Sequence, residues 1–145
     1  MEGVYLLRNA ASGLVLATEG GRSGSGTRLR LAEPAGTTGH WRVRPVHTGA
    51  GIFHLEHVDS GKLLDVAGAS TESGARVQLW KANGYGAQEW LLEEHLDQPG
   101  VVTLVACISG LPLDVDEEGR ARQWQESDAP TQGWRLEPTD RTPTP

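Results

Sequence analysis

Apolar and polar residues alternate with a period of two along most of the chain, which is the pattern of half-buried β-strands. Gly, Asn, Asp and Ser separate the alternating runs, and these residues favour turns. No segment carries the periodicity of an amphipathic helix. Twelve strands are predicted, at Val4–Asn9, Leu14–Thr18, Thr27–Ala32, His40–Val46, Ile52–Val58, Lys62–Ala67, Arg76–Ala82, Glu89–His95, Val101–Ile108, Leu111–Asp116, Arg120–Glu126 and Gly133–Pro138.

Two short signatures recur along the chain at nearly equal intervals. A Ser-Gly pair precedes one apolar strand in each repeat, and a Trp is the second residue of the last predicted strand. The pairs are Ser12-Gly13, Ser60-Gly61 and Ser109-Gly110, and the tryptophans are Trp41, Trp90 and Trp134. Recurrence at a fixed period is typical of a repeat architecture.

The repeats divide the chain into three units of four strands, at about 4–46, 52–95 and 101–138. One unit cannot bury its apolar face alone, whereas three around an axis can close a barrel that has no free edges. We therefore predict an all-β fold, a β-trefoil with twelve strands in three pseudo-threefold repeats, as a single domain over 1–138. Residues 139–145 are rich in Pro and Thr, and we predict a disordered tail there.

Equivalent apolar positions of the three units supply the predicted core. They are Leu7, Leu55 and Leu104, then Tyr5, Phe53 and Val102, and the three tryptophans at 41, 90 and 134. Trp80 and Trp124 lie out of register with these positions, so we predict them at the surface. Cys107 lies in an apolar strand, which predicts a buried and inert thiol.

Composition narrows the classes of partner. The formal net charge is −6 and the basic residues form no run, which argues against nucleic acid and anionic membranes as partners. The N-terminus lacks the pattern of a signal peptide, and the one Cys can form no intrachain disulfide. We expect a cytoplasmic protein, or a secreted one if the chain is an excised domain.

No metal or cofactor is predicted from the sequence. The five histidines show no metal-ligand spacing with carboxylates, and no phosphate-binding loop or Ser/His/Asp order is present. His54 and His57 are predicted on a solvated strand face.

Units that combine the motif S-G-x-x-L-D-V with a terminal Q-x-W resemble the ricin B-type lectin family, which includes family-13 carbohydrate-binding modules. The resemblance covers about Val4 to Leu136. It implies one shallow sugar site in each intact unit, where an Asp accepts hydrogen bonds from sugar hydroxyls and an aromatic ring stacks on the pyranose. This pairing suits a sugar, because a pyranose has C–H bonds on one face and hydroxyls at its rim.

The second unit matches the family pattern best. The resemblance implies a sugar site built from Asp65, Gly68, Gln78, Trp80, Asn83 and Gln88. Ala87 is a departure, because binding members usually carry Asn there, and the amide contacts of that residue are missing.

The third unit keeps fewer of the implied sugar-binding residues, namely Asp114, Trp124 and Gln132. Arg122 replaces Gln78, and Thr131 stands where Asn is expected. We predict a weaker or different site there.

The first unit has Ala17 in place of the Asp, Leu31 in place of the aromatic residue, and Gly39 in place of the Gln. We predict that it does not bind sugar. Family members often bridge two cysteines within a unit, and this chain has no such pair.

The leading hypothesis is a non-catalytic carbohydrate-binding protein whose partner is a galactose-, arabinose- or xylose-type mono- or oligosaccharide. One alternative is a trefoil repurposed for contact with a protein partner, and another is a small-molecule enzyme such as a cofactor-free cyclase. A carboxylate in an apolar strand is costly unless it finds donors. Asp65 and Asp114 are therefore either ligand contacts or residues that stabilise a turn.

Overall fold

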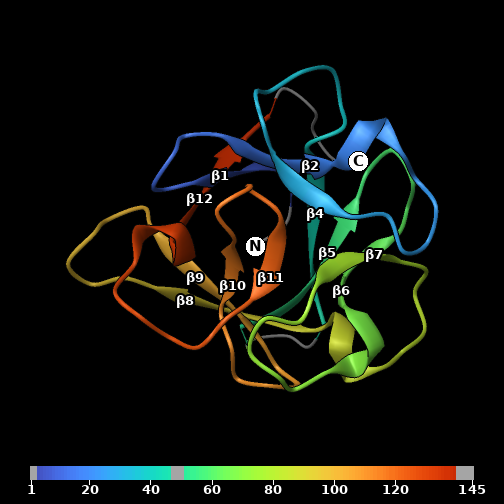
Figure 1. Cartoon of the computed structure of the whole chain (residues 1–145). Coiled ribbons are helices and arrows are strands. Elements are labelled where there is room, and N and C mark those ends of the chain that lie inside the picture. Colours follow the sequence, from blue (N-terminus) through green and yellow to red (C-terminus); the bar gives the residue numbers. More distant parts are fainter. Residues whose placement is uncertain (1–2, 47–50, 140–145) are drawn as a thin grey trace.

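The computed structural model describes residues 3–46 and 51–139, which form an all-β fold (Figure 1). Its strands are β1 (Gly3–Asn9), β2 (Val15–Thr18), β3 (Leu29–Ala32), β4 (His40–Pro45), β5 (Ile52–His57), β6 (Leu63–Val66), β7 (Val77–Trp80), β8 (Trp90–Glu94), β9 (Val102–Ala106), β10 (Leu113–Val115), β11 (Ala121–Gln123) and β12 (Trp134–Pro138). Four 3-10 turns accompany them, η1 (Glu19–Gly21), η2 (Ala67–Ala69), η3 (Gly86–Gln88) and η4 (Pro130–Gln132). Within these described ranges, no helix is long and apolar enough to cross a membrane.

All twelve predicted strands are present, and most are shorter than predicted at their ends. The sixth shows why, since β6 stops at Val66 and the chain then turns through η2. Gly68 in this turn has φ 64°, a left-handed conformation that ends the extended strand. The alternation of apolar residues locates each strand, and the turn geometry sets its ends.

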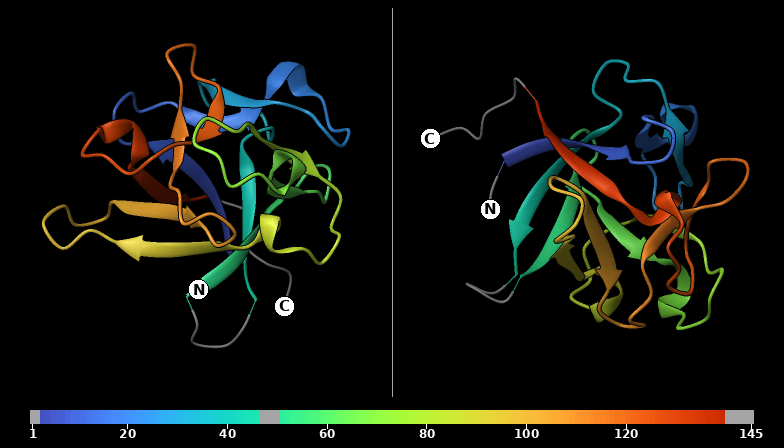
Figure 2. Two further views of the ribbon diagram at one scale, coloured as in Figure 1. Left: turned by 60° about the horizontal axis from the view of Figure 1, so that its bottom comes forward. Right: turned by 90° about the vertical axis from the view of Figure 1, so that its left-hand side faces the viewer.

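The strands close into a six-stranded barrel. Neighbours pair antiparallel in the order β1-β4-β5-β8-β9-β12, and β12 returns to β1. The remaining strands form the hairpins β2–β3, β6–β7 and β10–β11, one for each repeat (Figures 1 and 2). This arrangement is the predicted β-trefoil.

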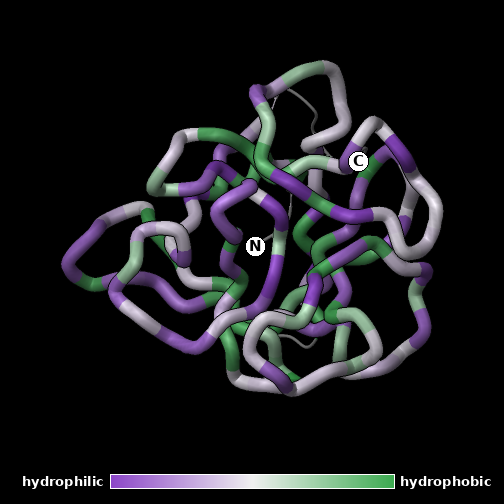
Figure 3. Tube along the Cα trace, viewed as in Figure 1, coloured by the Kyte–Doolittle hydropathy of each residue, from purple (hydrophilic) through white to green (hydrophobic). Residues whose placement is uncertain are grey.

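The core repeats three times around the barrel. Leu7, Leu55 and Leu104 are buried, as predicted. Three tryptophans are fully buried: Trp41 in β4, Trp90 at the start of β8 and Trp134 at the start of β12. Each indole N–H donates to a backbone carbonyl of the adjoining hairpin. The pairs are Trp41 to Leu16 at 3.0 Å, Trp90 to Leu64 at 3.0 Å and Trp134 to Leu113 at 3.1 Å. Hydrophobic and hydrophilic stretches alternate along the trace (Figure 3).

His57 is buried, and the prediction of a solvated strand face was wrong for it. Its Nδ1 lies 2.9 Å from Ser60 Oγ, and its Nε2 lies 2.9 Å from the carbonyl oxygen of Thr38. The ring also meets the Trp41 indole edge-on, with 5.2 Å between centroids. The imidazole therefore satisfies polar groups beneath the Ser60-Gly61 turn. Asn9 does the same in the first repeat, where its amide bonds to the carbonyl of Thr131.

Cys107 is exposed, and the prediction of a buried thiol was also wrong. Strand β9 ends at Ala106, so Cys107 lies in the turn that follows. Its backbone N–H donates to the carbonyl of Glu89 at 3.0 Å.

Beyond Thr139, the predicted tail at 139–145 lies outside the described residues. Thr139 itself is tied to the first strand, because its N–H and hydroxyl both donate to the carbonyl of Val4.

Candidate functional site

The β6–β7 hairpin brings together the Asp, Gln and Trp of the second repeat. Asp65 lies opposite Gln78 in the register, and Leu63 lies opposite Trp80. Because residues two apart on a strand share a face, Gln78 and Trp80 point to the same side of β7. The sequence LLDV followed by VQLW therefore places a carboxylate, an amide and an indole on one surface.

The same register corrects one assignment in the first repeat. Ala17 lies opposite Arg30, so it is the equivalent of Asp65. Two residues further along the strand from Arg30 is Ala32, which is the equivalent of Trp80. Leu31 was the wrong choice for this position by one residue, and such a slip moves a side chain to the opposite face. The first repeat thus has Ala at both of its principal positions.

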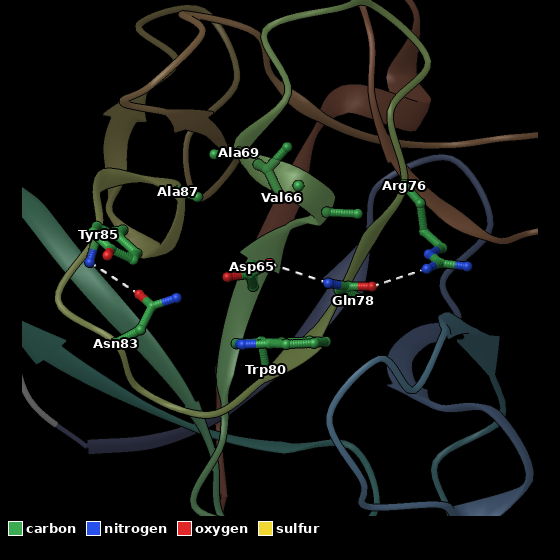
Figure 4. Close-up of a pocket in the computed structure, with 11 residues that line it drawn as sticks. Asp65, Val66, Ala69, Arg76, Gln78, Trp80, Asn83, Tyr85 and Ala87 are labelled. Atoms are coloured by element: carbon green, nitrogen blue, oxygen red, sulfur yellow. Dashed lines mark hydrogen bonds between the residues drawn. The ribbon is translucent and has the colours of Figure 1, made fainter.

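The second-repeat surface is hollowed into a pocket of about 430 Å³ (Figure 4). Five of the six predicted residues line it, and Gln88 does not. The lining residues are Asp65, Val66, Ala67, Gly68, Ala69, Arg76, Gln78, Trp80, Asn83, Tyr85 and Ala87.

Asp65 is the buried acid of this pocket, with 4% of its surface exposed. Its Oδ1 accepts from Gln78 Nε2 at 3.3 Å, and its Oδ2 accepts from Gln88 Nε2 at 3.0 Å. Burial raises the pKa of the Asp65 carboxyl, and the two amide donors partly oppose that rise. Each carboxylate oxygen can accept more than one hydrogen bond, so acceptor capacity remains for a ligand.

Gln88 forms hydrogen bonds both with Asp65 and with the loop that precedes Gln88 in the chain. Its Nε2 also donates to the carbonyl of Lys81 at 2.9 Å, and its Oε1 accepts the N–H of Asn83 at 3.1 Å. The side chain is fully engaged and buried, so Gln88 positions other groups. Gln132 repeats the two loop contacts, with Gln125 and Ser127.

Trp80 forms an exposed wall of the pocket. It is 36% exposed, and Figure 4 shows its ring edge-on below Asp65 and Gln78. Gly26 of the first repeat packs against the ring, since a Cβ added there would lie 3.8 Å from Trp80 Cζ3. One side of the ring is thereby supported by a neighbouring repeat.

Two further lining residues, Tyr85 and Arg76, were not predicted. Tyr85 is 69% exposed, and its N–H donates to Asn83 Oδ1 at 2.9 Å within the loop before η3. Arg76 Nη2 donates to Gln78 Oε1 at 3.1 Å, which turns the Gln78 amide so that Nε2 faces Asp65. For Tyr85, the available sequence signal was an aromatic residue inside the turn Asn83-Gly84-Tyr85. For Arg76 the available signal was its place two residues before Gln78 in the predicted strand 76–82, since residues two apart on a strand share a face.

The third repeat has the same elements in a different state. Asp114 is buried, and its Oδ2 accepts from Arg122 Nη2 at 3.1 Å and Nε at 3.2 Å. Asp114 Oδ1 has no hydrogen-bond partner among residues 3–46 and 51–139. Among the described residues, the Gln132 side chain forms hydrogen bonds only with the loop before it. It therefore makes no bond to Asp114 of the kind that Gln88 makes to Asp65.

The second repeat of this β-trefoil thus carries a buried acid and an exposed aromatic residue on one hairpin. The family model for ricin-type β-trefoil lectin domain-like proteins matches residues 1–80 and 37–120. The chain belongs to this family. Family membership supports carbohydrate binding as its general function and a non-catalytic domain as its class. No curated protein matches in a sequence comparison.

Solved structures share the fold over nearly the whole chain. A designed threefold symmetric protein, ThreeFoil, is 32% identical with a TM-score of 0.88, over 94% of this chain and 99% of its own. An exo-β-1,3-galactanase from Clostridium thermocellum is 25% identical with a TM-score of 0.86, over 94% of this chain and 30% of its own. The ricin B-like lectin of Macrolepiota procera, solved with lactose, is 17% identical with a TM-score of 0.78, over 94% of this chain and 95% of its own. At that last identity the likeness concerns the fold alone.

Proposed function

We propose that the chain is a non-catalytic lectin domain that binds one pyranose in the second-repeat pocket. The observation that carries the proposal is the Asp65 carboxylate, buried and held by two amides beside the exposed Trp80 ring. A pyranose stacked on Trp80 would present its hydroxyls to Asp65 and to the remaining hydrogen-bond donors and acceptors of the Gln78 and Asn83 amides. Apolar C–H contact and charge-assisted hydrogen bonds then act on the same ligand.

Galactose-type sugars are the first candidates, followed by arabinose and xylose types. The galactanase among the similar structures acts on a galactose polymer by its name, which favours this order. Ala87 is buried in the pocket wall and offers a methyl group where an amide would add a contact. We therefore expect weak binding, with a Kd on the order of 1 mM.

The second repeat is the principal site in this proposal. In the third repeat the guanidinium of Arg122 forms an ion pair with Asp114 and covers the face of Trp124. A sugar must displace this guanidinium to bind there. In the first repeat Ala17 and Ala32 offer neither a carboxylate nor a ring.

Calorimetric titration with the methyl glycosides of galactose, arabinose and xylose tests the proposal. We expect at least one to bind at millimolar concentration, Trp80→Ala to abolish the binding, and Trp124→Ala to leave it unchanged. Because both tryptophans hold equivalent places, Trp124→Ala is the matched control. Absence of binding by all three sugars, or equal binding by Trp80→Ala, would contradict the proposal.

An acid–base enzyme is the second candidate, because the pKa of the Asp65 carboxyl is raised. The exposure of Trp80 and Tyr85 argues for the lectin, since an acid–base site gains from exclusion of water. Turnover of a bound glycoside, followed by NMR and lost in Asp65→Asn, would favour the enzyme. A protein-binding role would instead be shown by a stable protein complex that is insensitive to Trp80→Ala.

A further inference from the structure

Arginines gather where the three hairpins meet, although the chain has a net charge of −6. Isolated backbone bridges join the hairpins to one another across repeats. They pair Arg28 with Gln78, Arg30 with Arg120, and Arg76 with Arg122. Five arginines are thus brought together from the first, second and third repeats.

Some of these charges are already neutralised. Arg122 pairs with Asp114, and Arg120 lies 3.1 Å from Glu118 Oε2 and 3.9 Å from Glu19 Oε2. Arg76 donates to the neutral amide of Gln78. Among residues 3–46 and 51–139, no hydrogen bond or ion pair is found for the side chains of Arg22 and Arg28. Positive charge therefore remains at the first-repeat side of the cluster.

A second pocket, of about 330 Å³, lies at these uncompensated charges. Its lining residues are Glu19, Arg22, Ser25, Gly26, Thr27, Arg28 and Arg76. The pocket is lined by three arginines and one carboxylate, that of Glu19. The Glu19 carboxylate is also shared with Arg120. Guanidinium groups bind carboxylates and sulfates through paired N–H donors, so this pocket suits an anionic group.

Arg76 lines both pockets, which makes them neighbours. Figure 4 shows Arg76 on the far side of Gln78 from Asp65, beside the blue first-repeat segment. That segment also supports the sugar pocket, because Ser25 Oγ accepts the N–H of Lys81 at 3.1 Å and Gly26 packs on the Trp80 ring. A ligand larger than one sugar can therefore contact the sugar pocket and the arginines together.

We propose that the natural ligand is an acidic oligosaccharide whose neutral pyranose stacks on Trp80 and whose next sugar places a carboxylate or sulfate among Arg22, Arg28 and Arg76. This inference rests on the proposed function. The acidic group belongs in the second pocket because the Asp65 carboxylate would repel it in the first. The structure thus separates a subsite for hydroxyls from a subsite for negative charge.

Titration with three disaccharides tests the inference: a neutral one, one that ends in a uronic acid, and its sulfated counterpart. We expect an acidic disaccharide to bind roughly tenfold more tightly than the neutral one, and the advantage to shrink as salt is added. If only one acidic disaccharide gains affinity, that result identifies the anionic group.

The double variant Arg22→Gln/Arg28→Gln should lose the acidic preference and keep its affinity for the neutral disaccharide. The control Arg44→Gln/Arg135→Gln removes the same charge from strands β4 and β12, and it should keep the preference. Equal binding of neutral and acidic disaccharides by the unmodified protein, or a preference that survives in Arg22→Gln/Arg28→Gln, would overturn the inference. Failure of the neutral sugar to bind at all would instead contradict the proposed function.

Discussion

The guanidinium carbon of Arg122 lies 4.0 Å from the centre of the Trp124 ring and over its face. The same guanidinium holds the buried Asp114 carboxylate through Nε and Nη2. These two groups are the equivalents of Trp80 and Asp65 in the second repeat. One arginine therefore takes the place of a sugar, with a cation–π contact on the ring and an ion pair on the acid.

Arg122→Gln should open the third repeat as a second sugar site, because Gln78 at the equivalent position leaves the Trp80 ring exposed. The stoichiometry of sugar binding in calorimetry should rise from one to two per chain. Loss of the ion pair at the buried Asp114 should lower the free energy of unfolding by roughly 1–3 kcal/mol.

The double variant Arg122→Gln/Trp124→Ala is the control for this gain, and it should return the stoichiometry to one. A folded Arg122→Gln protein that still binds one sugar would show that the arginine does not close the site.

The strands and the core could be predicted from the sequence because their signals are local and repeated. The period-two alternation locates each strand, and the recurring tryptophans locate the centre of the core. Cys107 shows where such signals end, since the apolar run 105–108 continues past the last residue of β9. Alternation does not indicate where a strand turns away from the core.

The state of each site could not be predicted in the same way. Asp114 and Trp124 hold the places in the third-repeat hairpin that Asp65 and Trp80 hold in the second. Only side-chain geometry shows that Arg122 lies across them. The arginine-lined pocket joins residues from two repeats, Arg28 and Arg76 among them, and no single stretch of sequence reveals it.

Gln88→Leu should weaken both the fold and the site, because one amide serves three groups. The Asn83 N–H and the Lys81 carbonyl would lose their partner, and Asp65 would keep one amide donor of two. We expect the free energy of unfolding in urea to fall by about 3 kcal/mol and sugar affinity to fall roughly tenfold.

Gln132→Leu is the matched control for Gln88, since it removes the equivalent loop bonds with no bond to an acid. It should destabilise the protein and leave sugar affinity unchanged. If Gln88→Leu also left affinity unchanged, the amide would have no part in positioning Asp65.

The raised pKa of Asp65 predicts opposite effects of pH on binding and on stability. Sugar affinity should fall as pH drops through the raised pKa, because the carboxylate then loses its charge. The folded state binds the proton more tightly than the unfolded state, so the contribution of Asp65 to stability should fall as pH rises between the ordinary aspartate range and the raised pKa. Titrations and urea unfolding over a pH series measure the two effects. In Asp65→Asn both of these pH dependences should disappear, and their persistence would assign them to another group.

Ala69 has φ 52°, a left-handed conformation that strains a residue with a Cβ by about 1–2 kcal/mol. The first repeat carries Gly21 at the equivalent place, with φ 69°. Ala69→Gly should therefore raise the free energy of unfolding by roughly 0.5 kcal/mol, once the entropy of the added glycine is subtracted. Ala67→Gly in the same turn, where φ is not positive, should lower it by about 0.5–1 kcal/mol. Because the Ala69 methyl lines the sugar pocket, Ala69→Gly should also weaken sugar binding. Equal destabilisation by the two substitutions would show that the turn stores no strain at Ala69.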